Sequence, residues 1–342
     1  MTKERQGQKK MENHSTLISR AKESALSGKI LDKRDVMALL EIDPNSDACK
    51  ELGQAARYVA AKVCNNKAYL WAAIGIDYRA CPMNCDYCSL GESWGLVRNE
   101  SELTEDEVIQ MAEKYVHEGV KWIVLRTTQF YSFEKLMDLA RKIKSVVAGN
   151  YQLVANAGEF NESTANKLVD AGFEYIYHTV RLREGINTKF DPEERKKTLK
   201  AIQRSSLNLV SLIEPIGVEH SNEEIADSFF NAIKYGAVVT GAMARVPVKG
   251  TPLGELPGLS NQRLAQIIAV SRLAAGVHAP DICVHPASEL AIAWGANVAV
   301  VESGSIPRDT CCSSKEVWNG FDPETAQKWF HAGGYEAISN ED

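Results

Sequence analysis

Three of the eight cysteines in this 342-residue chain lie close together, in the segment Cys81-Pro82-Met83-Asn84-Cys85-Asp86-Tyr87-Cys88. Three thiolates on one short loop can bind three irons of a cubane iron–sulfur cluster, whereas a cluster held only by protein needs a fourth cysteine. The next cysteine along the chain is the distant Cys283. The spacing therefore predicts a cluster with one iron left open to a small molecule.

A zinc site is the simpler alternative. Structural zinc takes four ligands, usually as two pairs of cysteines or histidines. The motif supplies only three local ligands, and His178 is a distant candidate for the fourth. The ligand count favours an iron–sulfur cluster over zinc, and it also disfavours a closed structural cluster.

The elements that must position these cysteines follow a strand–helix rhythm that begins near residue 69. Short β-branched runs alternate with amphipathic stretches, which is typical of a parallel sheet covered by helices. We expect strands at 69–76, 122–127, 151–156, 175–180, 209–215, 238–246, 281–285 and 297–302. Helices are expected at 104–118, 132–148, 161–172, 191–205, 222–235, 260–276 and 286–294. Eight such strands predict a closed (β/α)8 TIM-type barrel, with an open doubly wound sheet as the alternative.

The cysteine loop follows the first of these strands, and barrels of this type carry their active sites at the carboxyl ends of the strands. Apolar residues at helical spacing predict helices before the first strand. We divide the chain into an N-terminal helical extension (1–68), the barrel (69–304) and a loop-rich C-terminal tail (305–342) with a short helix near 323–332.

Composition limits the classes of function. Hydrophobic residues make up 44% and charged residues 25%, with a net charge of −6, so nothing indicates a nucleic-acid surface. No apolar run approaches the roughly 18 residues of a membrane helix, and the polar start has no secretory h-region. We expect a cytoplasmic protein that binds neither nucleic acid nor membrane. In that reducing compartment, clustered cysteines indicate metal or catalysis rather than disulfides.

The motif resembles the signature of the radical S-adenosylmethionine (SAM) superfamily, Cys-x3-Cys-x-aromatic-Cys, with Tyr87 at the aromatic position. The resemblance implies a [4Fe–4S] cluster on Cys81, Cys85 and Cys88, with SAM on the open iron and its adenine along Tyr87. It also implies a flavodoxin- or ferredoxin-type electron donor. The implied activity is reductive cleavage of SAM to a 5′-deoxyadenosyl radical that acts on a small-molecule or carrier-bound substrate.

Within the superfamily the chain resembles the biotin-synthase-like branch. That branch includes biotin synthase, the [FeFe]-hydrogenase maturase, methylornithine synthase and, among its relatives, archaeal-type lipoyl synthase. Lys249-Gly250-Thr251-Pro252-Leu253 after the sixth expected strand and Ile268-Ala269-Val270-Ser271-Arg272 in the next helix carry this likeness. The branch implies a full eight-stranded barrel with helices in front and a role in cofactor biosynthesis.

The resemblance also implies residues around SAM. Thr127, Thr128 and Gln129 stand where relatives carry a glycine-rich turn for the SAM amino group, and Asn156 stands where the ribose is bound. Arg195 resembles the arginine that pairs with the SAM carboxylate, for which a planar guanidinium is well suited. The remaining implied cofactor-binding residues are Glu159, His178, Arg181 and Gly217.

Two features of this set concern the substrate. Arg181 or Arg183 stands where relatives often carry a carboxylate, which suggests an anionic substrate. Cys283, Cys311 and Cys312 are candidates for an auxiliary iron–sulfur cluster, with Cys283 facing the barrel interior and Ile282 and Val284 facing outward.

The sequence leaves three functions open. One is sulfur insertion of the biotin or lipoyl synthase type, which needs stored sulfide. Another is carbon-skeleton rearrangement like that of methylornithine synthase, which needs no second cluster. The third is a non-catalytic metal-binding protein.

Overall fold

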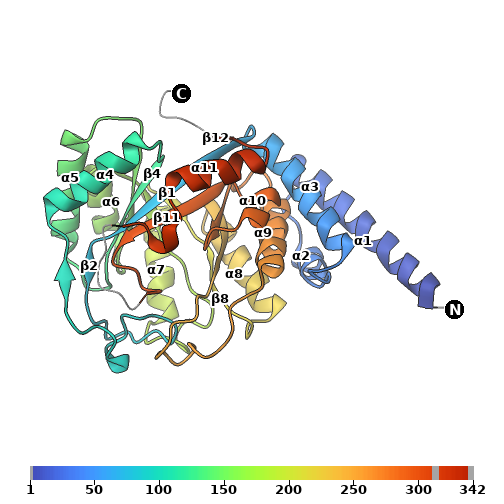
Figure 1. Ribbon diagram of the computed structural model, residues 1–342, viewed down its shortest axis with the longest axis horizontal. Coiled ribbons are helices and arrows are strands. Elements are labelled where there is room, and N and C mark those ends of the chain that lie inside the picture. Colours follow the sequence, from blue (N-terminus) through green and yellow to red (C-terminus); the bar gives the residue numbers. More distant parts are fainter. Residues whose placement is uncertain (1–2, 310–315, 338–342) are drawn as a thin grey trace.

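A computed structural model describes residues 3–309 and 316–337, and within this part eight parallel strands close into a barrel. The first strand pairs with both the second and the last, and this pairing closes the barrel. The strands are β1 (Lys67–Gly75), β4 (Trp122–Arg126), β5 (Gln152–Asn156), β6 (Phe173–Tyr177), the broken strand β7 (Asn208–Val210) with β8 (Ile213–Ile216), β9 (Ala237–Ala244), β10 (Asp281–His285) and β11 (Val298–Gly304). The predicted TIM-type barrel is confirmed (Figure 1).

The helices that follow the strands form the outer layer of the barrel (Figure 1). They are α4 (Glu105–His117), α5 (Phe133–Val146), α6 (Glu162–Asp170), α7 (Pro192–Gln203), α8 (Asn222–Lys234), α9 (Asn261–Ala275) and α10 (Glu289–Ala293). Side-chain N-caps fix their starts, and Thr104 with Glu107 and Ser221 with Glu224 form capping boxes.

Three helices precede the barrel: α1 (Lys3–Leu26), α2 (Lys33–Leu40) and α3 (Asp47–Val63). They pack beside α9, which is buried from Leu264 to Ala275. A helix covered on all sides must be apolar around its circumference, and α9 has this character. Figure 1 shows α1 extending away from the barrel at its N-terminal end.

The C-terminal segment returns to the start of the first strand. A short helix η2 (Trp318–Gly320) leads to α11 (Pro323–Ala332) and β12 (Glu336–Ala337), and β12 pairs with β1 at Lys67. The smaller pieces η1 (Glu92–Trp94), β2 (Asp77–Tyr78) and β3 (Ser101–Glu102) flank the cysteine loop. No helix in the described ranges has the length and apolarity to cross a membrane. The three-part division at 68 and 304 stays a prediction.

The fifth strand departs from its prediction. The sequence predicts one strand at 209–215, whereas the structure breaks it into β7 and β8. At the break the Ser211 amide donates to the Val239 carbonyl, and the Thr240 hydroxyl donates to the Ser211 carbonyl at 2.9 Å. The Thr240 side chain therefore satisfies the Ser211 carbonyl, which regular strand pairing would otherwise satisfy. The apolar pattern of the sequence does not reveal this hydrogen bond.

Aromatic side chains fill the amino-terminal half of the barrel interior. Trp71 lies with its ring centroid 6.0 Å from Trp122 and 6.0 Å from Tyr177, and Trp122 lies 5.8 Å from Tyr175. Alternate residues of each strand point inward, so this layer leaves the carboxyl half of the interior to smaller and polar groups. The cavity lined by Cys81, Cys85 and Cys88 lies there.

Candidate active site

The three motif cysteines line the cavity at the carboxyl end of the barrel, together with Tyr87. The cavity has about 1300 Å³ of space, part of it open to solvent. The tyrosine hydroxyl is buried and has no hydrogen-bond partner in the described residues. The structure thus brings the motif together on one wall of a single cavity.

Backbone hydrogen bonds fasten the cysteine loop to distant segments. The Asp86 amide donates to the Asn187 carbonyl at 2.9 Å, and the Ser89 amide donates to the Pro307 carbonyl at 2.8 Å. Asn84 adopts a left-handed φ of 43°, and its side chain accepts from the Ser93 amide at 2.9 Å. The loop is therefore held by the segments that follow β6 and β11, and its position does not depend on local structure alone.

Burial raises the pKa of all three thiols, to about 12 for Cys85 and about 11 for Cys88. The thiols are neutral without a ligand, so binding a metal group must release their protons. No group of three or more His, Cys, Asp or Glu side chains that could hold a single metal ion is found in the described ranges. Three cysteine thiols on one cavity wall fit the donor set of a cluster with one open iron.

The residues predicted to meet the SAM amino group and ribose line the same cavity. Thr127, Thr128, Gln129 and Asn156 follow the ends of β4 and β5. The Thr128 amide donates to Asp77 at 2.8 Å, and the Thr127 amide donates to the Asn156 carbonyl at 2.9 Å. These polar groups form one rim of the cavity beside the cysteine loop.

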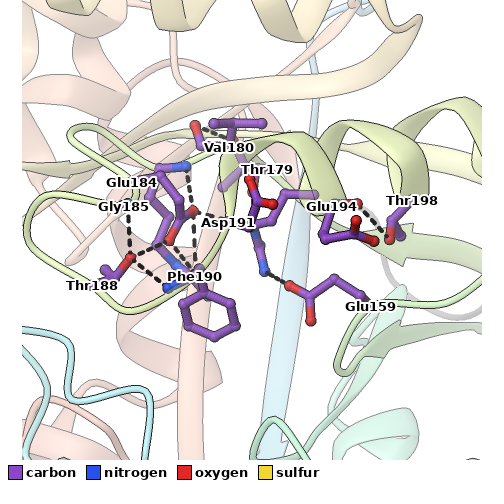
Figure 2. Close-up of polar contacts among 12 residues, drawn as sticks. Glu159, Thr179, Val180, Glu184, Gly185, Thr188, Phe190, Asp191, Glu194 and Thr198 are labelled. Atoms are coloured by element: carbon purple, nitrogen blue, oxygen red, sulfur yellow. Dashed lines mark hydrogen bonds and ion pairs between the residues drawn. The ribbon is translucent and has the colours of Figure 1, made fainter.

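Four other predicted residues do not lie on the cavity lining: Glu159, His178, Arg195 and Gly217. Arg195 is 3% exposed. Its Nε donates to the Thr179 carbonyl at 2.7 Å and lies 3.1 Å from Glu184, and its Nη1 pairs with Glu159 at 2.8 Å. Figure 2 shows the partners Glu159, Thr179 and Glu184. Its assignment to the SAM carboxylate stays a prediction.

His178 points outward from the barrel, opposite to Tyr177 on β6. Its ring lies edge-on to Phe160 at 6.4 Å, and its Nε2 is buried with no partner in the part of the chain that the structure describes. Burial, Arg195 and Arg181 hold the pKa of His178 well below its usual range. The ring is neutral and belongs to the layer between barrel and helices.

Arg181 lies on the cavity wall near the cysteine loop, as the sequence suggests for an anion-binding group. Its guanidinium contacts Glu184 at 3.3 Å and Glu214 at 3.6 Å. The Tyr177 hydroxyl donates to Glu214, whose pKa is raised by burial although Arg181 opposes this. This buried chain of charges links β6 and β8.

A second charged cluster was not predicted from the sequence. Glu302 on β11 accepts from Arg126 of β4, from Arg308 just after β11, and from His285 of β10 at 2.7 Å. All four side chains line the cavity. The sequence signal was available: Glu302 continues the inward series of Val298 and Val300, so its carboxylate has to face the interior.

Cys283 faces the barrel interior, and Ile282 and Val284 face the outer core, as predicted. Its thiol is 1% exposed and lines the cavity, and burial raises its pKa. Cys311 and Cys312 lie outside the described residues.

Comparison with known proteins agrees with this geometry. A family model described as the Radical SAM superfamily matches residues 76–233. Biotin synthase from Sulfurihydrogenibium sp. (strain YO3AOP1) is 24% identical over 268 residues, covering 75% of this chain and 78% of that protein. Biotin synthase from Renibacterium salmoninarum is 26% identical over 277 residues, covering 78% and 77%.

Two solved structures share the fold at low identity. Methylornithine synthase superposes with a TM-score of 0.78 at 17% identity, covering 94% of this chain and 98% of that one. The [FeFe]-hydrogenase maturase HydG gives 0.77 at 16% identity, covering 98% and 80%. At this identity the likeness concerns the fold alone.

Proposed function

We propose that the chain is a radical SAM enzyme that binds a [4Fe–4S] cluster through Cys81, Cys85 and Cys88, and the match of the Radical SAM superfamily model to residues 76–233 supports this. When bound, the cluster and SAM supply reductive carbon–sulfur cleavage, which yields methionine and a 5′-deoxyadenosyl radical. The observation that carries the proposal is the placement of three thiols on one wall of a barrel cavity, on a loop with no fourth cysteine. An external electron donor of the flavodoxin or ferredoxin type is part of this proposal.

The chain's own residues have separate tasks around SAM. Tyr87 presents its ring and a buried hydroxyl to the cavity beside the cysteines, in support of an adenine contact. The hydroxyls of Thr127 and Thr128 and the amide of Gln129 can accept hydrogen bonds from an ammonium group. Asn156 is placed on the same rim for the ribose hydroxyls.

Two arginines can serve the SAM carboxylate. Arg181 lines the cavity, whereas Arg195 does not line it and pairs with Glu159 and Glu184. We retain Arg195 as the residue that binds the SAM carboxylate, which requires Glu159 to release its ion pair with Arg195. We assign Arg181 to the cavity wall between cofactor and substrate. The aromatic layer in the amino-terminal half of the barrel interior excludes water from the reacting centre, and this exclusion protects a radical from side reactions.

Two reaction classes remain candidates for this site. Sulfur insertion in cofactor biosynthesis, as the name biotin synthase of the relatives suggests, needs a sulfur source beside the substrate. Among the described cysteines outside the motif, Cys283 faces the cavity and could help to hold such a sulfur source, with Cys311 or Cys312 as its predicted partner. Carbon-skeleton rearrangement, the reaction class of methylornithine synthase, would leave Cys283 as an apolar wall residue.

Iron and sulfide content tests the cluster and separates the two classes. We expect about four irons per chain for one cluster and about eight for two. Cys81→Ala, Cys85→Ala and Cys88→Ala should each lose the cluster, whereas Cys49→Ala, a buried cysteine on α3, should retain it. Zinc without iron in the wild type would support a non-catalytic metal-binding protein instead.

A triple variant with alanine at Cys283, Cys311 and Cys312 separates sulfur insertion from rearrangement. Sulfur insertion predicts that it loses about half of the iron while it still cleaves SAM. Wild-type iron content in this variant would favour rearrangement.

A further inference from the structure

The Glu302 cluster has an excess of positive charge that faces the cavity. Arg126 and Arg308 both pair with one carboxylate oxygen of Glu302, and His285 takes the other at 2.7 Å. Two guanidiniums and one carboxylate leave one net positive charge on this part of the wall.

One donor of the cluster lacks an acceptor. Arg308 Nε is buried and has no hydrogen-bond partner in the described residues. Arg308 Nη1 contacts the Met243 sulfur at 3.8 Å, and a thioether sulfur is only a weak acceptor. Buried polar groups almost always have a partner, so the free Arg308 N–H indicates an acceptor that binds in the cavity.

The cluster is held from behind by Trp318 of η2. The indole stacks on His285 with ring centroids 6.1 Å apart and an interplanar angle of 7°, and the Arg308 guanidinium lies 5.7 Å from the indole centroid. Arg126 is fixed separately, because it also donates to the Ser305 carbonyl at 2.5 Å. The donors are therefore positioned before any ligand arrives, which lowers the entropic cost of binding.

The cavity below the cluster is apolar. Its walls there are formed by the side chains of Trp71, Ala73, Val124, Leu212 and Val300. Ala73 pairs with Glu302 and Trp71 with Val300, so Trp71 lies two residues deeper, or about 7 Å at the rise of a parallel strand. An extended alkyl chain covers this depth with about five carbon–carbon bonds.

We infer that the barrel binds a short organic acid, with its carboxylate on Arg308 and Arg126 and an apolar chain of about five carbons directed toward Trp71. This inference rests on the proposed function, because it takes the cavity as the substrate site, and it names the substrate's chemical class. SAM itself has a carboxylate, so the test must separate the two sources of the same chemistry.

The test uses the cluster-loaded, SAM-bound enzyme and straight-chain monocarboxylates from butanoate to decanoate, with binding followed by calorimetry and tryptophan fluorescence. We expect affinity to rise about fourfold per methylene up to hexanoate or heptanoate and then to level off. Hexanamide, which has the same chain without the charge, should bind at least tenfold more weakly than hexanoate.

Arg308→Gln should reduce hexanoate affinity at least tenfold and leave hexanamide affinity within twofold. Arg126 remains paired with Glu302 in this variant, so no buried carboxylate is left without a cation. Arg126→Gln is the second variant and should also weaken hexanoate binding, because it removes the other guanidinium of the cluster while Arg308 stays paired with Glu302. The matched control is Arg141→Gln on α5, an exposed arginine paired with Asp138, which should bind hexanoate as the wild type does.

Three results would overturn the inference. The first is equal affinity for hexanoate and hexanamide in the wild type. The second is equal hexanoate affinity in Arg308→Gln and Arg141→Gln. The third is a loss of SAM affinity in Arg308→Gln as large as the loss of hexanoate affinity, which would assign the cluster to the SAM carboxylate. Hexanoate binding by a wild type that cannot cleave SAM would support the acid site and contradict the proposed function.

Discussion

Replacing Glu302 by glutamine should destabilise the barrel strongly. Burial alone would raise the pKa of Glu302, but Arg308, His285 and Arg126 together hold it well below the ordinary range, so the carboxylate is ionised at neutral pH. Glutamine keeps the shape and removes the charge, which leaves two buried guanidiniums without a counter-ion. Breaking a buried ion pair in this way costs about 3–5 kcal/mol.

A double-mutant cycle tests whether this cost arises from the charge pairing. Arg308→Gln alone should cost less than Glu302→Gln, since Arg126 and His285 still pair with the carboxylate. Combining the two changes removes one of the unpaired cations. The double variant should therefore be more stable than the sum of the single effects predicts, by about 0.5–3 kcal/mol.

The assay is urea-induced unfolding followed by tryptophan fluorescence, with the same iron content in every variant because a bound group adds its own stabilisation. Glu324→Gln on α11 is the control, because Glu324 and its partner Lys328 are about 70% exposed, and we expect no measurable loss. A loss below about 1 kcal/mol in Glu302→Gln, or single effects that simply add, would refute the assigned pairing.

Three further predictions concern other parts of the site. Burial, Arg195 and Arg181 hold the pKa of His178 well below its ordinary value of 6.5. The neutral ring therefore contributes fully to the free energy of unfolding above about pH 6.5, and this contribution is lost as pH falls below that value. The loss should reach at most about 1.4 kcal/mol per pH unit, and His178→Gln should flatten that slope; parallel curves for both proteins would contradict this. Gly75→Ala places a Cβ 1.9 Å from the Ser305 carbonyl oxygen, so it should displace the end of β1 and reduce iron incorporation, unlike Gly258→Ala, whose Cβ comes no closer than 3.6 Å to its neighbours; equal iron contents would show that the close approach does not matter. Arg195→Ala should weaken SAM binding by about 1.5–3 kcal/mol relative to Lys196→Ala, whose side chain pairs with Glu193 at the surface, and equal SAM affinities by calorimetry would remove Arg195 from the site.

The sequence predicts the barrel well because its strands are short β-branched runs between amphipathic helices. It fails at the fifth strand, where the bond from Thr240 to Ser211 satisfies a carbonyl without a continuous ladder. Such a side-chain bond depends on a neighbour that is 29 residues away, which no local pattern contains.

The candidate site was only partly predictable, for a similar reason. The cysteine loop is one continuous motif, so its residue types and spacing suffice to find it. The Glu302 cluster joins residues from β4, β10 and β11 that meet only when the barrel closes. Strand alternation predicts that Arg126 and Glu302 both point into the barrel, but it does not predict that the two side chains contact each other. Arg195 stays a prediction, because its motif assigns it to the SAM carboxylate while its pairing with Glu159 and Glu184 could not be foreseen from the local sequence.

The most direct test of the central claim is SAM cleavage by the anaerobically reconstituted protein. With dithionite and SAM, we expect the wild type to release 5′-deoxyadenosine and methionine in equal amounts, and Cys49→Ala to do the same. Cys81→Ala, Cys85→Ala and Cys88→Ala should release neither product above the background without protein. Full cleavage by any of these three variants, or no cleavage by a wild type that has about four irons per chain, would contradict the account.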